Sequence, residues 1–265
     1  MEITSGSATL AAESHGEGEP TVLLVHAGVT DQRSWAPVVE ALPGHRCLTY
    51  DARGYGRTTY EQEDGWSPVE DAVAVLDAYG VGSAVVVGCS MGGRTSLDLA
   101  LTHPERVSAL VLIGSAVSGA PPLDLEPGLE GLEQLFEEAE QSGDLDVLNG
   151  LEAQVWLDGP FQPEGRVGGE ARELFLDMNR IALEAPEPGE QREEVNAWEA
   201  CGEVAVPTLV MIGEHDLRHT HRNAHHLAES IPDARLVDLP GVAHLPHLER
   251  DERTLREISA FVSDR

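Results

Sequence analysis

The sequence contains no lysine: all 17 of its basic residues are arginine, set against 47 acidic residues and a formal net charge of −30. Without lysine the chain cannot form a Schiff base with a carbonyl substrate or with pyridoxal phosphate. It also lacks the Gly-Lys-Ser/Thr loop that cradles nucleotide phosphates. A surface of this charge repels nucleic acid and anionic membranes, so neither is an expected partner.

Cysteine is scarce as well, and the three present, Cys47, Cys89 and Cys201, are irregularly spaced. An odd number at such spacing predicts reduced thiols in a cytoplasmic protein, not a disulfide framework or a metal site. The first residues show no basic segment followed by an apolar stretch, so no signal peptide is expected. No apolar run approaches the roughly 18 residues of a membrane helix.

What the 265 residues do contain is an apolar fraction of 41%, enough for one large domain with a buried core. Short β-branched apolar runs predict buried strands, and helical patterns separate them. This alternation predicts an α/β fold with a mostly parallel central sheet flanked by helices. The predicted strands are 21–26, 47–50, 84–88, 107–113, 206–213 and 235–239, and the predicted helices are 67–79, 95–102 and 251–262.

A long segment, residues 118–203, interrupts the alternation. Its composition is mostly helical, with helices expected at 129–141 and 171–183, and turns that contain proline and glycine break it up. It holds 22 acidic residues and only four arginines, a net charge of −18, whereas the other 179 residues carry −12. We therefore expect a core made of residues 1–117 and 204–265, with 118–203 forming a distinctly acidic helical cap.

The sharpest chemical signal is the segment Gly88-Cys89-Ser90-Met91-Gly92-Gly93, which follows a predicted strand and precedes a helical pattern. A serine on such a tight turn has a strained backbone and an exposed hydroxyl, and small neighbours let the strand and the helix approach each other. The amino end of the helix favours negative charge developing at this point. Ser90 is therefore a candidate nucleophile.

A serine nucleophile needs a base that is oriented by an acid. The chain offers both, because Asp216 follows one late strand and His244 follows the next. Loops at the carboxyl ends of parallel strands meet at one edge of the sheet, where Ser90 also lies. Two rivals remain: Asp238 ends a strand, and His247 comes three residues after His244, where the last helix is expected to begin.

Five motifs together resemble the lid-bearing α/β-hydrolases, among them bacterial esterases, enol-lactonases and cofactor-free haloperoxidases. The likeness runs from about Thr21 to the C-terminus, although residues 118–203 match only in position and helical character. It implies an α/β-hydrolase fold with a helical lid inserted after the sixth strand, and no cofactor is expected. The motifs are Val25-His26-Ala27-Gly28 with Trp35, Asp51-Ala52-Arg53-Gly54-Tyr55-Gly56-Arg57-Thr58, the segment around Ser90, Gly213-Glu214-His215-Asp216 and Gly241-Val242-Ala243-His244.

The resemblance implies a role for each residue of the triad. Ser90 would attack the substrate carbonyl, and His244 would take the serine proton and later deliver one to the leaving group. Asp216 would fix the histidine tautomer and stabilise the imidazolium. The backbone N–H of Met91 would be one oxyanion donor.

The second oxyanion donor would come from the loop after His26. Relatives usually have glycine directly after that histidine, whereas this chain has Ala27. The donor is therefore Gly28 or Val29, and alignment favours Gly28. His26 itself is expected to shape the loop through hydrogen bonds to the backbone.

Other residues have less specific assignments. Asp51 and Arg53 are expected to hold the loop after the second predicted strand. Candidate pocket residues are Trp35 and, in the expected lid, Trp156, Phe161 and Met178, although the lid residues fit a lid core equally well. The five histidines at 215, 219, 221, 225 and 226 are spaced irregularly, so solvated side chains are favoured over a metal site.

These features predict a serine hydrolase that cleaves a small, neutral carboxylic ester or lactone through an acyl-enzyme. The acidic lid disfavours anionic substrates. The alternatives are an aminopeptidase-like amide hydrolase, a perhydrolase on the same triad, and a small-molecule receptor with slow turnover. A small molecule is the expected partner, and the oligomeric state, monomer or homodimer, is open.

Overall fold

The computed structural model describes residues 1–122, 126–192 and 195–265. At its centre is one sheet with the strand order β1-β2-β4-β3-β6-β7-β8-β9, with β5 paired to β2. Strands from β4 to β9 along this order are parallel, whereas β1, β2 and β5 pair antiparallel at one edge. The strands are β1 (Glu2–Ser5), β2 (Ala8–His15), β3 (Val22–Val25), β4 (Cys47–Tyr50), β5 (Thr59–Tyr60), β6 (Ala84–Cys89), β7 (Val107–Ile113), β8 (Thr208–Gly213) and β9 (Ala234–Leu239).

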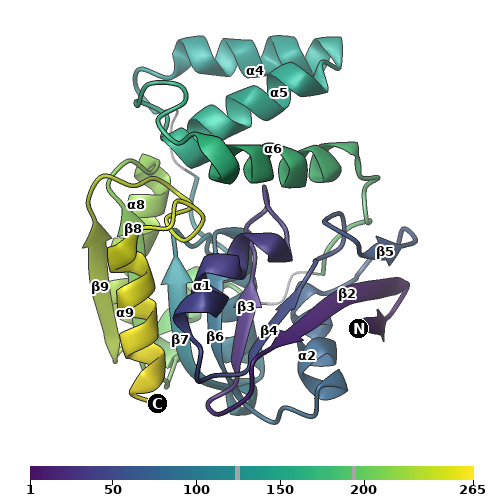
Figure 1. The fold of residues 1–265 in the computed structure, drawn as a ribbon, viewed down its shortest axis with the longest axis vertical. Helices are drawn as coiled ribbons and strands as arrows, with labels where there is room; N and C mark the ends of the chain where they lie inside the picture. The colour runs from purple at the N-terminus through teal and green to yellow at the C-terminus, as the bar shows by residue number, and fades with distance from the viewer. Residues whose placement is uncertain (123–125, 193–194) are drawn as a thin grey trace.

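Helices cover both faces of this sheet (Figure 1). One apolar cluster joins the sheet to α2, α3 and α8, and a second joins it to α1 and α9. The α-helices are α1 (Ala36–Ala41), α2 (Pro68–Ala78), α3 (Met91–Thr102), α4 (Glu130–Ser142), α5 (Leu145–Glu152), α6 (Gly169–Glu184), α7 (Ala197–Ala200), α8 (Arg218–Ser230) and α9 (Glu252–Ser263). Shorter segments are the 3-10 turns η1 (Gln32–Trp35), η2 (Pro104–Arg106) and η4 (Cys201–Glu203), and the π-helix η3 (Ala153–Asp158).

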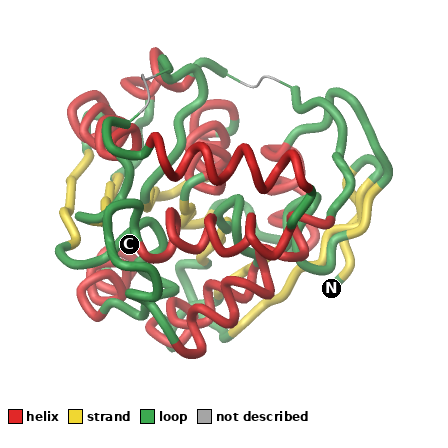
Figure 2. Tube along the Cα trace, turned by 90° about the horizontal axis from the view of Figure 1, so that it is seen from above, coloured by secondary structure: helices red, strands yellow, loops and turns green. Residues whose placement is uncertain are grey.

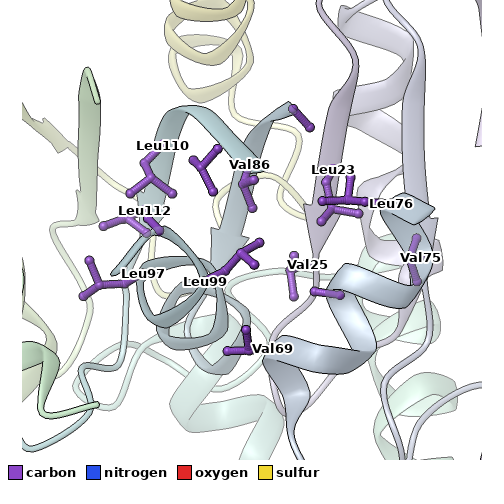
Figure 3. Close-up of a cluster of buried hydrophobic side chains, with 14 of the residues drawn as sticks. Leu23, Val25, Val69, Val75, Leu76, Val86, Leu97, Leu99, Leu110 and Leu112 are labelled. Atoms are coloured by element: carbon purple, nitrogen blue, oxygen red, sulfur yellow. The ribbon is translucent and has the colours of Figure 1, made fainter. Parts of the chain in front are cut away.

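The apolar runs of the sequence are explained by burial on both faces of the sheet. Along β6, Val86 points into the cluster formed with α2 and α3, whereas Val85 and Val87 point into the cluster formed with α1 and α9. Figure 3 shows the first cluster, with Val86 and Leu110 from the strands facing Leu97 and Leu99 of α3. A strand buried in this way needs apolar residues at every position, which confirms the predicted parallel α/β sheet.

Residues 118–203 leave the sheet after β7, which is the sixth strand of the chain if the two-residue β5 is not counted. Within this segment α4, α5 and α6 lie side by side above the strands (Figures 1 and 2). The segment contacts loops at the carboxyl ends of β3 and β9, so it lies over that edge of the sheet. In the part of the chain that is described, no helix is both long and apolar enough to cross a membrane.

Candidate active site

Ser90 occupies the turn between β6 and α3, and its backbone is in an unusual conformation, with φ 53° and ψ −115°. A positive φ strains a residue that has a Cβ atom, so the turn is held by its surroundings. The Ser90 N–H donates to the Ile113 carbonyl at 2.9 Å, and the Ser90 carbonyl accepts from the Arg94 N–H at 3.0 Å. A Cβ atom at Gly92 would overlap the Val25 carbonyl, so the crossing of strand and helix requires glycine there.

Asp216 and His244 form a buried pair. Asp216 Oδ2 lies 2.7 Å from His244 Nδ1, and both side chains are only 1% exposed. Asp216 Oδ1 accepts the Leu217 N–H at 2.7 Å. Burial opposes ionisation of the carboxyl, but the charge and hydrogen bond of His244 outweigh it and lower the pKa of Asp216. The rival Asp238 lies on an exposed position of β9, so its carboxylate is not part of this pair.

The pair lies beside the Ser90 turn. Cys89 Sγ donates to the His244 carbonyl at 3.6 Å. Gly114 directly follows Ile113, the residue that holds the Ser90 N–H. A Cβ atom at Gly114 would lie 2.9 Å from His244 Nδ1, which explains the glycine with φ 50° at this position. His244 Nε2 is buried and has no hydrogen-bond partner in the described residues, so this ring nitrogen is available to a nucleophile.

The two proposed oxyanion donors are close to each other. Met91 is the first residue of α3, where backbone N–H groups have no partner inside the helix. A Cβ atom built on Gly28 would lie 3.7 Å from Met91 Cβ, which places the loop after β3 against the start of α3. The arrangement is compatible with a site in which two backbone N–H groups converge on one oxygen atom.

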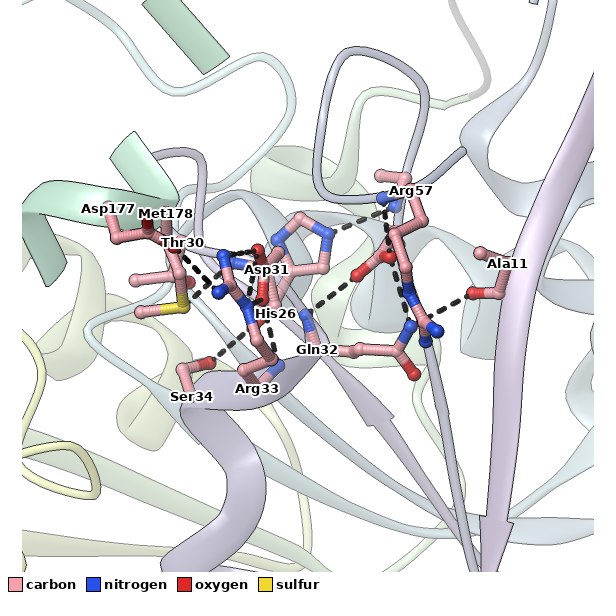
Figure 4. Close-up of polar contacts among 12 residues, drawn as sticks. Ala11, His26, Thr30, Asp31, Gln32, Arg33, Ser34, Arg57, Asp177 and Met178 are labelled. Carbon is pink, nitrogen blue, oxygen red and sulfur yellow. Dashed lines mark hydrogen bonds and ion pairs between the residues drawn. The ribbon is translucent and has the colours of Figure 1, made fainter. Parts of the chain in front are cut away.

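Polar contacts hold the loop after β3 in place (Figure 4). His26 Nδ1 donates to the Ala27 carbonyl at 2.8 Å, and His26 Nε2 accepts the Ala52 N–H at 3.0 Å. Burial lowers the pKa of His26, which keeps the ring neutral, as these two roles require. The predicted loop-shaping role of His26 is confirmed by these contacts.

Asp51 and Arg53 hold the loop after β4, as predicted. Asp51 Oδ1 accepts the Gln32 N–H at 3.0 Å, and Asp51 Oδ2 accepts the Arg57 N–H at 2.8 Å, so one carboxylate joins the loops after β3 and β4. The Arg53 guanidinium makes a two-point contact with Asp71 of α2, at 2.9 and 3.0 Å. Planar two-point pairing of this kind fixes orientation as well as distance.

The segment 118–203 contacts the site through α6 and through the π-helix η3. Arg33 bonds Asp31 in the loop after β3 and also lies 2.6 Å from Asp177 on α6 (Figure 4). Trp156, in the π-helix η3, packs its ring at 4.7 Å from the His244 ring. Of the predicted pocket residues, Trp156 is therefore the one that the structure brings to the candidate base.

The other predicted pocket residues lie elsewhere. Trp35 is fully buried and stacks on His247, with ring centroids 4.2 Å apart, so it belongs to the core beneath the site. Met178 is also fully buried in the cluster that includes α1 and α9, where its sulfur accepts the Asp31 N–H at 3.4 Å. Phe161 is 56% exposed on the surface. An apolar side chain in 118–203 can lie in the core, on the surface or in a pocket, and the sequence pattern does not distinguish these three positions.

Arg166 and Glu249 were not recognised from the sequence. Arg166 donates to the Leu157 and Gly241 carbonyls and lies 2.7 Å from Glu249 Oε2. Glu249 Oε1 accepts the N–H of Ala243, the residue before His244, at 2.8 Å. The segment 118–203 is thereby tied to the loop that carries the candidate base. The sequence signal that could have found this contact is the rarity of arginine in 118–203. A cation among so many acidic residues has carboxylates available to pair with.

His247, the rival base, is a core residue. It is fully buried, and neither ring nitrogen has a hydrogen-bond partner in the described residues. Burial lowers the pKa of His247 to about 3, and the nearby His244 adds to the shift. The ring is therefore neutral at neutral pH, and it stacks on Trp35, whereas the carboxylate of Asp216 pairs with His244.

His247 should make the fold sensitive to acid. In the unfolded chain it binds a proton below about pH 6.5, whereas in the folded chain it does so only near pH 3. The stability that the neutral His247 contributes is therefore fully present above about pH 6.5 and is lost as the pH falls toward 3. Between pH 7 and pH 5 we expect His247 alone to cost about 2 kcal/mol.

Urea unfolding of wild type and His247→Phe at pH 7 and pH 5 measures this effect. Between pH 7 and pH 5, the free energy of unfolding of His247→Phe is expected to fall by about 2 kcal/mol less than that of the wild type. The exposed His225→Gln variant is the control and should behave as the wild type does. Equal losses in wild type and His247→Phe would contradict the prediction.

The histidines from 215 to 226 do not converge. His226 stacks on Trp198, with ring centroids 3.6 Å apart, and His215 contacts Gln162. Across residues 1–122, 126–192 and 195–265, no three His, Cys, Asp or Glu side chains are placed to hold a metal ion.

Comparison with known proteins places the chain in a family. The sequence model of the alpha/beta hydrolase fold matches residues 20–251, so the chain belongs to the α/β-hydrolase fold family. It is 29% identical to rhodomycin D methylesterase DauP of Streptomyces sp. (strain C5), with 91% of each chain covered. It is 26% identical to a Bacillus subtilis (strain 168) protein provisionally named 2-succinyl-6-hydroxy-2,4-cyclohexadiene-1-carboxylate synthase, with 99% of this chain and 97% of the relative covered.

Solved structures agree with this result. The structure described as Est816, an N-acyl homoserine lactone degrading enzyme, is 26% identical and superposes with a TM-score of 0.75, with 99% of this chain and all of that chain covered. The predicted resemblance to α/β-hydrolases is therefore confirmed. The relatives include hydrolases of esters and a lactone-degrading enzyme, but also a synthase, so family membership alone leaves the reaction to be argued from the site.

Proposed function

We propose that the protein is a serine hydrolase that cleaves small, neutral carboxylic esters or lactones through an acyl-enzyme. The observation that carries the proposal is the buried Asp216–His244 pair, at 2.7 Å, beside the strained turn that carries Ser90. The free Nε2 atom of His244 supports its role as the base. The methylesterase and the lactone-degrading enzyme among the similar proteins agree with this choice of substrate.

In the proposed reaction, the Ser90 hydroxyl attacks the substrate carbonyl while its proton passes to His244 Nε2. The carbonyl oxygen becomes an oxyanion that the Met91 and Gly28 N–H groups bind. The intermediate then collapses, the proton moves from His244 to the leaving alkoxide, and an acyl-enzyme remains. Water attacks this ester by the same route, which releases the acid and restores the hydroxyl of Ser90.

Asp216 acts through His244. Because its carboxylate accepts a hydrogen bond from Nδ1–H, the ring proton stays on Nδ1 and the lone pair on Nε2, where the serine proton must go. When the imidazolium forms, the buried carboxylate stabilises it. The lowered pKa of Asp216 keeps the carboxylate ionised for this role.

Residues 118–203 form the lid in this proposal, over a core made of 1–117 and 204–265. The lid excludes water from the acyl-enzyme and selects the substrate. Its net charge of −18 disfavours anionic substrates, because charges within a Debye length of about 10 Å act on an approaching ligand. This favours neutral esters.

The test is a panel of p-nitrophenyl esters of increasing acyl length, together with neutral lactones and amino-acid amides. We expect turnover of short esters and covalent labelling by a fluorophosphonate, which mass spectrometry locates on the peptide that holds Ser90. A folded protein that neither turns over any ester or lactone nor takes the label would refute the proposal. Turnover of amides above esters would favour the aminopeptidase-like alternative.

A further inference from the structure

The hydroxyl group of Tyr55 lies close to Gly28, one of the two residues whose N–H groups form the proposed oxyanion site. A Cβ atom built on Gly28 would lie 3.4 Å from the Tyr55 Oη atom and 3.7 Å from Met91 Cβ. Tyr55, Gly28 and Met91 therefore lie close together, although they come from the loop after β4, the loop after β3 and the start of α3. The sequence placed Tyr55 in a family motif but did not connect it with the chemistry.

The position of this hydroxyl is fixed by the loop that carries it. The Tyr55 N–H donates to the Ala52 carbonyl at 3.1 Å, and the Tyr55 carbonyl accepts the Thr58 N–H at 3.3 Å. The ring packs edge-on against His26, with centroids 4.9 Å apart and planes at 66°. Because His26 is itself held by two backbone hydrogen bonds, the phenol is held in place before any ligand arrives.

The hydroxyl is also available. In the described part of the chain it makes no hydrogen bond, whereas the hydroxyl of nearby Tyr60 donates to the Pro186 carbonyl. Tyr55 lines a cavity of about 250 Å³ together with Met91 and Arg94. Ser90, Gly28 and His244 do not line this cavity, so the link between Tyr55 and the proposed oxyanion site rests on its closeness to Gly28. A partly buried phenol hydroxyl with no partner in the described residues can donate its hydrogen bond to a ligand.

Tyr55 remains a donor over the working pH range. Burial raises the pKa of Tyr55 to about 12, with a further contribution from Glu152 that Arg94 partly offsets. The group is therefore a neutral phenol that can donate one hydrogen bond.

We propose that Tyr55 is a third oxyanion donor, which gives its O–H to the carbonyl oxygen of the substrate beside the Met91 and Gly28 N–H groups. This inference rests on the proposed function. An oxyanion can accept a third hydrogen bond, and a bond to a charged acceptor is stronger than one to a neutral carbonyl. The contact therefore acts mainly in the transition state, and kcat should depend on it more than KM does.

The experiment compares wild type, Tyr55→Phe and the matched control Tyr60→Phe on the best ester of the panel. We expect Tyr55→Phe to lower kcat about tenfold or more, with KM changed less than about twofold. A trifluoromethyl ketone, whose adduct with the serine carries an oxyanion, should bind Tyr55→Phe more weakly by the same factor as the loss in kcat/KM. The control should match the wild type in all three quantities.

A merely structural role for Tyr55 predicts a different pattern: a lower melting temperature, or a rise in KM, without a matching loss of ketone affinity. That pattern would overturn the inference, as would a Tyr55→Phe enzyme with the wild-type kcat. If the wild type itself has no turnover, the proposed function fails and this inference fails with it. If the wild type is active and Tyr55→Phe has the same kcat, the inference about Tyr55 fails and the proposed function stands.

Discussion

Replacing Ser90 by alanine is expected to abolish ester turnover, with a loss in kcat on the order of 10⁴-fold or more. The hydroxyl oxygen is the one heavy atom that the substitution removes, and the proposed acyl-enzyme cannot form without it. The fold should be retained, because the turn is held by backbone contacts to Ile113 and Arg94 that alanine preserves. Burst kinetics and fluorophosphonate labelling measure the loss directly.

Ser90→Gly is the matched variant. Like Ser90→Ala it lacks the hydroxyl, but it also lacks the Cβ atom that strains the backbone at this position. At φ 53° a residue with a Cβ atom is strained, whereas glycine is not. We expect Ser90→Gly to be as inactive as Ser90→Ala but more stable than it by about 1 kcal/mol in urea unfolding. Residual turnover in both variants near the wild-type level would show that another group is the nucleophile.

Replacing Asp216 by asparagine is expected to lower kcat by about 10⁴-fold, since the His244 tautomer is then wrong for catalysis. In the wild type, the Asp216 carboxylate accepts hydrogen bonds from His244 Nδ1–H and from the Leu217 N–H. An amide has only one oxygen, so its NH2 group must face one of these two donors. If it faces His244, the ring proton moves to Nε2, and that nitrogen can no longer take the proton of Ser90.

Asp238→Asn is the control for this prediction, because it makes the same chemical change at an exposed position of β9. Its kcat should equal that of the wild type. The measurement is kcat across pH 5 to 9 for both variants, since an asparagine at 216 should remain slow at every pH at which the protein is folded. A large loss in Asp238→Asn and none in Asp216→Asn would reverse the assignment of the acid.

The parallel sheet was predictable because a strand that is buried on both faces appears in the sequence as a short, almost unbroken apolar run. The runs at 47–50 and 107–113 are strands with those same ends, since every residue needs an apolar neighbour on one face or the other. α3 was predicted from Thr95 but begins at Met91. Gly92 and Gly93 weaken the helical pattern there, and the strand-to-helix contact requires them.

The edge hairpin β1–β2 was not predicted, because its alternation of small and polar residues is weak evidence for a strand. The cap was predicted as helical, yet its contacts were not. No rule of spacing connects Arg166 with Glu249, which are 83 positions apart, or Trp156 with His244. Such contacts depend on how the cap packs on the sheet, and the sequence pattern of the cap records only that it is helical and acidic.

The attachment of the cap has a consequence for how this protein could change over evolution. Arg166 bonds the carboxylate that holds the residue before His244, and Trp156 packs against the His244 ring. An exchange of the whole 118–203 segment for that of a relative would therefore alter the base as well as the pocket. New substrates are more accessible to this chain through changes on α4 and α5, which leave both attachments intact, than through the gain of a foreign cap.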